Sequence, residues 1–317
     1  MCVYNGARYL PRQLESIAAQ SERPAAMVIL DDGSGDGSWE LLQSWASTAP
    51  FPVQVERNAT RLGVARNFER AVTLLGQDLV FLADQDDAWH ADKVATIVDR
   101  FARDPDLRLL HTDADLVDAE DRPLGQTLFG ALMITAHERA QVAGGVAYQV
   151  YARRNLVTGA TCAFRRSLLD EARPFSDRFL HDDWLAFVAA LVGKVEMLEK
   201  TTMRYRLHNA NAVGIPLPTF GWRLRNFAKA FATPTAGRQR ERADRLDELV
   251  ARARAHGARS DAIEYMVAAA AHARFRANLP RNPFKRLIGI ARERAAGHYH
   301  AWSSGPVSML HDLLIAG

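Results

Sequence analysis

The chain has 317 residues, of which 48% are hydrophobic and 24% are charged, with 20 Gly, 13 Pro and 2 Cys. This composition is typical of a globular protein and excludes collagen-like, low-complexity and disulfide-rich proteins. The formal net charge of +3 is unevenly spread. Residues 218–317 carry 17 Lys and Arg against 8 Asp and Glu, whereas residues 1–217 carry 23 against 29. An acidic N-terminal part followed by a basic C-terminal part argues against a uniformly basic nucleic-acid-binding protein.

Helices and strands alternate along the first part of the chain. Hydrophobic spacing predicts helices over residues 9–20, 38–45, 64–75 and 91–101, and strands over residues 26–30, 53–55, 78–82 and 107–111. This alternation predicts an α/β fold with a mostly parallel sheet covered on both faces. Further strands are predicted over 157–164, 195–198 and 203–206, with a helix over 181–192. Beyond Pro218 the sequence is helical and rich in Arg and Ala.

Polar clusters follow three of the expected strands. They are Tyr4-Asn5, Asp31-Asp32 and the run from Asp84 to Asp87. Ligands of such sheets bind beyond the carboxyl ends of the strands, so the three clusters are expected on one rim. Asp84-Gln85-Asp86-Asp87 could hold a hard divalent cation or form a solvated acidic turn. The Asp31-Asp32 loop could bind a nucleotide or simply lead into the next helix.

Later residues add further candidates. Asp182 and Asp183 open a predicted helix, where the helix dipole favours acids and where one of them could act as a general base. His208 could be a metal ligand, a phosphate contact or a surface residue. Arg204 and Arg206 could contact phosphate or pair with acidic side chains. The chain contains no G-x-G-x-x-G after a strand and no P-loop, which argues against those nucleotide sites.

Taken together, these motifs resemble a family 2 glycosyltransferase of the GT-A fold. The resemblance rests on seven motifs in order over residues 1–214: Tyr4-Asn5-Gly6, Asp31-Asp32-Gly33-Ser34, Asn58 with Gly63 and Asn67, Asp84-Gln85-Asp86-Asp87-Ala88-Trp89, Gly159 with Phe164-Arg165-Arg166, His181-Asp182, and Tyr205-Arg206-Leu207-His208. The Asp-Gln-Asp-Asp-x-Trp form and the His-Asp helix start are most similar to the bacterial rhamnosyltransferase-like branch.

The resemblance implies inverting transfer of a sugar from a nucleotide-diphosphate donor, with Mg²⁺ or Mn²⁺ as cofactor. It places Tyr4, Asn5, Asp31, Asp32 and Asp84 at the nucleotide sugar, with Arg206 as a further contact. Asp86 would meet the metal, and His208 would meet the metal or the diphosphate. Asp182 matches the catalytic base, and the family register favours it over Asp183. A glycan or lipid-linked acceptor in cell-surface polysaccharide synthesis is the expected partner.

Two regions are expected: a GT-A catalytic domain over residues 1–215 and a basic helical region over residues 216–317. Family members begin with a longer first strand, so we expect the first strand to be truncated and Met1 to be an internal residue. Residues 222–231 and 284–288 mix aromatic, apolar and basic side chains. They could pack on the catalytic domain or lie on an anionic membrane. We expect a cytoplasmic protein, peripheral on the inner membrane face if these helices bind lipid, and no nucleic-acid partner.

Two other functions are open at this point. A non-catalytic carbohydrate-binding protein could keep the same fold without the chemistry. A nucleotidyltransferase would need a Gly-rich phosphate loop and a Lys near the first strand, and residues 5–11 contain neither.

Overall fold

The computed structural model describes residues 1–208 and 235–315, and the predicted basic segment 222–231 lies outside these residues. The chain divides into two units. The first comprises residues 1–147 and 156–215, and the second comprises residues 148–155 and 216–317. Residues 148–155 thus group with the C-terminal part of the chain. Within the described ranges, no helix is long and apolar enough to cross a membrane.

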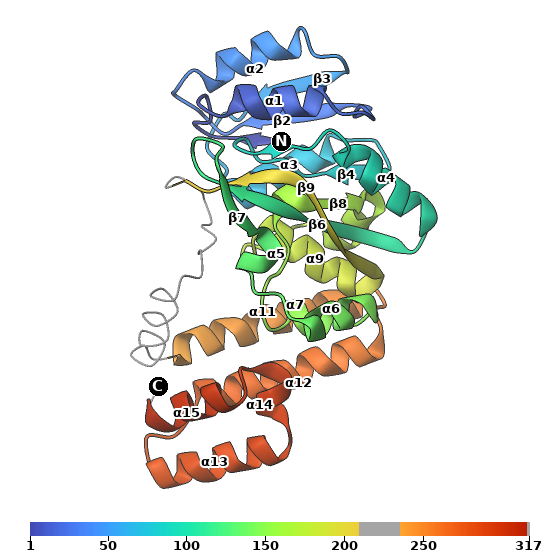
Figure 1. The fold of residues 1–317 in the computed structure, drawn as a ribbon. Helices are drawn as coiled ribbons and strands as arrows, with labels where there is room; N and C mark the ends of the chain where they lie inside the picture. The colour runs from blue at the N-terminus through green and yellow to red at the C-terminus, as the bar shows by residue number, and fades with distance from the viewer. Residues whose placement is uncertain (209–234, 316–317) are drawn as a thin grey trace. The chain divides into compact units, whose positions relative to one another are not determined.

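The first unit begins with a parallel three-stranded sheet. Its strands are β1 (Cys2–Val3), β2 (Met27–Asp31) and β3 (Val53–Arg57), in the order β1-β2-β3. Every residue of β2 is buried, as its continuous apolar run predicts. Helices α1 (Leu10–Ala18), α2 (Ser38–Ala46) and α3 (Val64–Thr73) connect and follow these strands (Figure 1).

Strand β1 is only two residues long. Cys2 pairs with Leu30 and Val3 with Asp31, and the amino group of Met1 donates to the Val28 carbonyl at 2.8 Å. Burial lowers the pKa of this amino group. A cavity of about 240 Å³ lies beside the strand, lined mainly by apolar side chains, among them Met27, Leu79 and Trp89.

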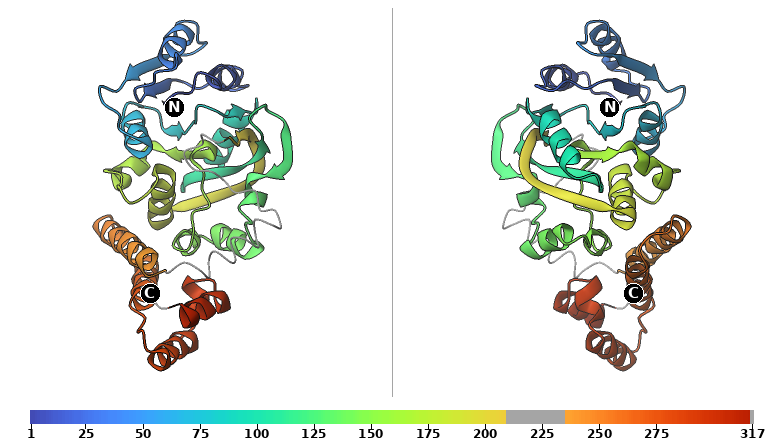
Figure 2. Two further views of the ribbon diagram at one scale, coloured as in Figure 1. Left: turned by 90° about the vertical axis from the view of Figure 1, so that its left-hand side faces the viewer. Right: turned by 90° about the vertical axis from the view of Figure 1, so that its right-hand side faces the viewer.

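A second, mixed sheet carries the rest of the unit. It contains β4 (Leu79–Phe81), β5 (Ala88–Trp89), β6 (Leu107–Val117), β7 (Pro123–Thr127), β8 (Cys162–Arg165) and β9 (Lys194–Arg206). The order is β4-β8-β6-β9-β5, with β7 paired to β6. Strands β6 and β9 run parallel and lie side by side (Figure 2), whereas the other pairs are antiparallel.

Two sequence predictions differ from this sheet. Residues 195–198 and 203–206 belong to one strand, β9, because its intervening polar residues stay paired to β6 through register shifts. Residues 157–164 are not one strand. The 3₁₀ turn η1 (Gly159–Thr161) interrupts them, since the Gly159 amide bonds a side chain instead of a neighbouring strand.

Helices complete the first unit. They are α4 (Lys93–Arg103), α5 (Leu128–Ala131), α6 (Ala136–Ala143), η2 (Arg166–Leu168), α8 (Leu169–Ala172) and α9 (His181–Val192). Residues 181–191 of α9 are all buried, so this helix is a core element with no solvent-facing side. Its first turn therefore holds Asp182 and Asp183 inside the unit.

The second unit is helical, as the sequence predicts for the C-terminal region. It contains α7 (Ala147–Tyr151, of which Ala147 belongs to the first unit), α11 (Ala236–Ala255), α12 (Ser260–Ala277), α13 (Pro283–Ala295), α14 (His298–Trp302) and α15 (Pro306–Leu314). Helices α11 and α12 pack along each other (Figure 1). Arg276 of α12 makes a two-point ion pair with Asp312 of α15 at 2.6 and 2.9 Å. Tyr299 also donates to Asp312, so this carboxylate joins three helices.

Candidate active site

The acidic loop after β4 is anchored to the end of β1. The Tyr4 amide donates to Gln85 Oε1 at 2.8 Å, and Gln85 Nε2 donates back to the Tyr4 carbonyl at 3.1 Å. Gln13 of α1 donates to the Asp84 carbonyl at 2.9 Å. The sequence analysis did not single out Gln13 or Gln85, although Gln85 stands inside the acidic motif. Together they hold two of the three predicted strand-end clusters in contact.

Asn5 links the end of β1 to the loop after β2. Its backbone has a φ of +50°, a left-handed conformation that Asn tolerates better than most residues. Its amide donates to Ser34 Oγ, and its Oδ1 accepts from the Gly35 amide, both at 2.9 Å. Tyr4 is exposed, and the Arg61 guanidinium lies 3.7 Å from its ring centroid. All three predicted clusters therefore meet at one rim.

Asp31 and Asp32 are both buried, and each has protein partners. Asp31 pairs with Arg57 at 3.0 Å and accepts from the Ser34 amide. Asp32 accepts from Asn58 Nδ2 at 2.7 Å and from the amides of Leu62 and Gly63, each at 2.8 Å. In this structure the two carboxylates fix the loops around the predicted nucleotide position.

Four carboxylates share the centre of the site. Burial, followed by the charges of Asp86 and Asp182, raises the pKa of Asp84 to about 7. Burial, with Asp86 and Asp84, also raises the pKa of Asp87 well above its usual range. Asp182 stands about 100 residues later in the sequence, yet its charge also raises the pKa of Asp84. The fold thus places Asp182, at the start of α9, close enough to the acidic loop for its charge to act on Asp84.

Lys93 is a buried cation whose charge acts on Asp84 and Asp87 of this cluster. Its ammonium donates to the Ala160 carbonyl at 2.6 Å and lies 4.3 Å from the Trp89 ring centroid. Burial lowers its pKa to about 7, against the opposing effect of Asp87. Lys93 could not be found from the sequence, because it stands at an ordinary helix start that gives no sign of burial.

Asp86 and His208 meet directly. His208 Nε2 lies 2.8 Å from Asp86 Oδ2, and the side chains are 9% and 13% exposed. The His208 ring stacks on Tyr9, with centroids 4.8 Å apart. The resemblance placed Asp86 at the metal and His208 at the metal or the diphosphate, and the fold brings these two side chains together across 122 positions.

Arg206 is held by the protein itself. Its guanidinium donates to the carbonyls of Asp86 and Asp118 and pairs with Asp121 at 3.0 Å. The side chain is almost fully buried. The sequence left two roles open for Arg206, contact with phosphate or pairing with an acidic side chain. The observed contacts are with protein groups, including the ion pair with Asp121. Arg206 holds the Asp86 backbone in place.

Asp182 is oriented by backbone amides. Its Oδ2 accepts from the Gly159 amide and its Oδ1 from the Asp183 amide, both at 2.8 Å. Beside it, His181 stacks on Phe68 with centroids 3.9 Å apart, and burial lowers the pKa of its imidazole. A Cβ at Gly159 would lie 2.8 Å from His181 Nε2, so this position requires glycine for close packing. Asp183 is equally buried and adjacent, so geometry alone leaves both acids near the site.

The donor set fits a hard divalent cation. Asp87 Oδ2 is buried and has no hydrogen-bond partner among the described residues, although Asp87 Oδ1 accepts from the Arg206 amide. A bound cation would satisfy Asp87 Oδ2 and the neighbouring carboxylates. A carboxylate beside an imidazole suits Mn²⁺ or Mg²⁺ when phosphate oxygens supply further ligands.

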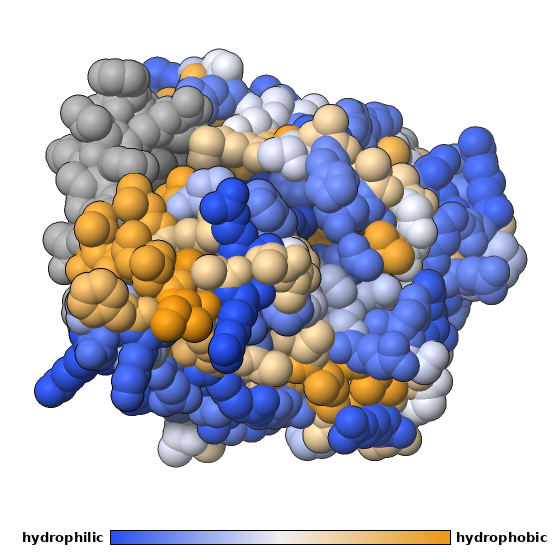
Figure 3. Space-filling model, turned by 90° about the horizontal axis from the view of Figure 1, so that it is seen from below, coloured by the Kyte–Doolittle hydropathy of each residue, from blue (hydrophilic) through white to orange (hydrophobic). Residues whose placement is uncertain are grey.

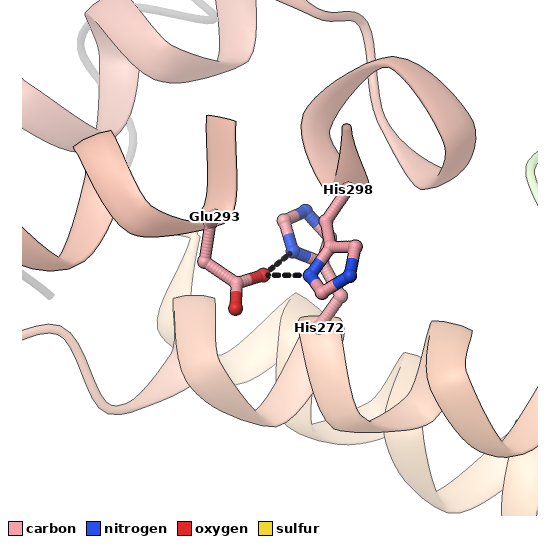
Figure 4. A group of neighbouring side chains, drawn as sticks. All are labelled: His272, Glu293 and His298. Carbon is pink, nitrogen blue, oxygen red and sulfur yellow. Dashed lines mark hydrogen bonds and ion pairs between the residues drawn. The ribbon is translucent and has the colours of Figure 1, made fainter. Parts of the chain in front are cut away.

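A second group of metal-type side chains lies in the helical unit. His272 Nδ1 and His298 Nδ1 lie 2.6 and 2.9 Å from the same oxygen of Glu293 (Figure 4). The three ligand-type atoms are within 4.8 Å of one another. Hydrogen bonds to one carboxylate account for this arrangement, which ties α12, α13 and α14 together.

A parallel sheet β1-β2-β3, an Asp-x-Asp loop bonded to the end of β1 and an acid at the start of α9 match the GT-A fold. The family model described as glycosyl transferase family 2 matches residues 1–171. The chain belongs to this family. The family that the sequence motifs predicted is thereby confirmed.

Characterised and uncharacterised relatives agree with this assignment. An uncharacterized glycosyltransferase of Nostoc sp. is 28% identical over 219 residues, which is 66% of this chain and 63% of that protein. The dTDP-rhamnosyl transferase RfbG of Shigella flexneri is 24% identical over 225 residues, 68% of this chain and 73% of that protein. The resemblance to the rhamnosyltransferase-like branch is thereby confirmed. The chain spans less than two thirds of the Nostoc relative.

Solved structures share the fold. S. aureus TarS in complex with UDP-GlcNAc has a TM-score of 0.61 at 13% identity, covering 99% of this chain and 88% of that chain. A mannosyltransferase of Pyrobaculum calidifontis in complex with GDP-Man and Mn²⁺ has a TM-score of 0.51 at 18% identity, covering 98% and 84%. At these identities the likeness concerns the fold alone.

Proposed function

We propose that this protein is an inverting, divalent-metal-dependent glycosyltransferase that moves a sugar from a nucleotide-diphosphate donor to a glycan or lipid-linked acceptor in cell-surface polysaccharide synthesis. The observation that carries the proposal is the 2.8 Å contact between Asp86 and His208, beside Asp84, whose pKa the charges of both Asp86 and Asp182 raise. We assign the catalysis to residues 1–215. The basic region 216–317 is assigned a supporting role.

The donor would lie along the rim where the three strand ends meet. The loops held by Asp31, Asp32 and Asn5 would form the nucleotide side, with the exposed Tyr4 ring as a direct contact. Asp84 would face the sugar diphosphate. Asp86 and His208 would hold Mg²⁺ or Mn²⁺ on the diphosphate, where the ion neutralises charge on the leaving group.

The acceptor hydroxyl would be deprotonated by Asp182. Its oxygen forms a bond to the anomeric carbon while the bond from that carbon to the phosphate oxygen breaks on the opposite face. The hydroxyl proton passes to the Asp182 carboxylate, and the nucleotide diphosphate leaves. The two amides that hold Asp182 fix its orientation, which a general base requires. Asp183 is the second choice for this role.

The donor sugar is proposed from the relatives. RfbG is named as a dTDP-rhamnosyl transferase, and RfbV of Salmonella typhimurium, 32% identical over 36% of this chain, as an abequosyltransferase. Both names denote deoxyhexoses, which supports a deoxyhexose such as rhamnose here. We place the reaction at the cytoplasmic face of the cell membrane, where two free cysteines such as Cys2 and Cys162 remain reduced.

A donor screen tests the proposal. Full-length protein is incubated with Mn²⁺ or Mg²⁺ and a panel of nucleotide sugars, and released nucleotide is identified by mass spectrometry. We expect hydrolysis or transfer with one class of donor, and its loss in Asp86→Asn and on chelation. Asp99→Asn, an exposed acid on α4, is the matched control and should retain activity. Glycan binding without any effect of nucleotide or metal would contradict the proposal and favour the carbohydrate-binding alternative.

A further inference from the structure

Helices α13 and α15 of the second unit each present an exposed apolar face. On α13, Phe284, Leu287 and Ile288 are 77%, 51% and 56% exposed at helical spacing i, i+3, i+4. On α15, Val307, Leu310 and Leu314 are 48%, 48% and 65% exposed at spacing i, i+3, i+7. Both helices also have buried side chains, so they are packed parts of the second unit and not frayed chain ends. Large apolar side chains gathered on a surface indicate an interaction site.

The two faces belong to one surface. Helices α13 and α15 pack against each other, and the Arg286 guanidinium of α13 reaches the Asp312 carbonyl of α15. The space-filling view from below shows apolar side chains gathered in a patch with hydrophilic side chains at its edge (Figure 3). We call the exposed apolar side chains of α13 and α15, namely Phe284, Leu287, Ile288, Val307, Leu310 and Leu314, the apolar helix face.

The charge around the apolar helix face is positive. Arg281, Lys285, Arg292 and Arg294 are exposed and make no ion pair within the described parts of the chain. The two acids of residues 281–315 are both engaged: Glu293 with His272 and His298, and Asp312 with Arg276 and Tyr299. The acidic groups that would offset the four cations are therefore turned to partners inside the unit.

We propose that the apolar helix face docks on an anionic lipid bilayer. Apolar side chains that enter the acyl boundary, ringed by Lys and Arg that meet lipid phosphates, are the chemistry of an interfacial amphipathic surface. The proposal rests on the proposed function, because a lipid-linked acceptor would be presented at that bilayer. It takes up the membrane alternative that the sequence left open for residues 284–288, whose apolar side chains Phe284, Leu287 and Ile288 are exposed.

Vesicle flotation of the full-length protein tests this docking. We expect binding to vesicles of phosphatidylglycerol and phosphatidylcholine in equal parts, little binding to phosphatidylcholine alone, and weaker binding as salt is added. The variants are the pair Phe284→Ser with Leu314→Ser, and the pair Lys285→Gln with Arg292→Gln. Each pair should weaken binding by about tenfold or more. Val267→Ser and Arg240→Gln, at exposed positions of α12 and α11, are the matched controls and should bind as wild type does.

Donor hydrolysis without vesicles separates the two proposals. We expect the face variants to keep wild-type hydrolysis and melting temperature, because the substituted side chains are exposed and lie outside the catalytic unit. An active enzyme that ignores anionic vesicles, or that binds them equally well in the variants, would overturn the docking. Self-association lost in the same variants without vesicle binding would overturn it in favour of a second copy. An inactive protein that binds vesicles would instead contradict the proposed chemistry.

Discussion

At the scale of single residues, the site is a set of acids whose charge the fold concentrates and whose positions it fixes. Asp86 touches His208, while Asp182 is held by two amides 2.8 Å away. The side chains around them serve mainly as supports: Gln85 ties the acidic loop to Tyr4, and Arg206 holds the Asp86 backbone. The reactive groups and the groups that position them are thus distinct.

The first prediction concerns the proposed base. Asp182→Asn keeps the size of the side chain and one of its two accepting oxygens, but it cannot take a proton. We expect donor binding to be unchanged and transfer to fall by about a hundredfold or more. Donor affinity measured by calorimetry and turnover measured by nucleotide release check the two parts. Turnover close to wild type would move the base to Asp183, whose Asn variant is the paired comparison.

The second prediction concerns acid stability. His111 is buried in β6 against Phe129, and burial lowers its pKa from 6.5 to about 3. The unfolded chain therefore takes up the proton first, so stability that is present above 6.5 is lost as the pH falls toward 3, by about 1.4 kcal/mol per pH unit. His111→Leu should flatten the pH dependence of the free energy of unfolding, measured by urea titration. The exposed His137→Leu should leave the slope as it is, and equal slopes in both variants would contradict this account.

At the scale of elements, the proposed base Asp182 is placed by close packing between η1, α3 and α9. Helix α9 is buried along its length, so its first turn cannot shift without disturbing the core. Phe68 of α3 stacks on His181, and η1 turns its Gly159 amide toward Asp182. The interruption of the strand predicted over 157–164 is therefore part of the site.

The third prediction tests this packing. In Gly159→Ala the new methyl group would lie 2.8 Å from His181 Nε2. The His181 ring is already stacked on Phe68 and has little room to move away. We expect a loss of about 1–3 kcal/mol in the free energy of unfolding, and a fall in transfer larger than any fall in donor binding. Gly76→Ala, where no atom lies within 4 Å, is the matched control. A stable variant with normal transfer would show that η1 does not position Asp182.

At the scale of the whole molecule, charge is divided between the two units. Burial and neighbouring carboxylates raise the pKa of Asp87 in the acidic cluster of the first unit, whereas the exposed cations near α13 lack acidic partners within the described residues. A divalent cation is expected to act on the first unit and an anionic surface on the second. The two effects are separable by measurement.

The fourth prediction follows from this division. Mn²⁺ and a nucleoside diphosphate are expected to bind the first unit only when it is folded. At a ligand concentration a hundredfold above the dissociation constant, this binding should raise the melting temperature of the first unit by roughly 5–10 °C. Differential scanning calorimetry of the full-length chain checks this, with chelation as the reversal. Asp86→Asn should abolish the shift, while the face variants of α13 and α15 should keep it. An unchanged melting temperature in the wild type would contradict a metal site at Asp86.

The sequence by itself determined the family, the α/β architecture, the helical C-terminal region and the short motifs, because these depend on local order along the chain. Strand-end acids such as Asp84 and Asp86 are visible as patterns, and parallel strands place their ends on one rim. Only the tertiary structure decided what depends on contacts between distant residues. It joined Asp86 to His208, turned Arg206 inward, buried Lys93 and left Phe284 exposed, because burial and pairing are set by packing across the fold and not by spacing in the sequence.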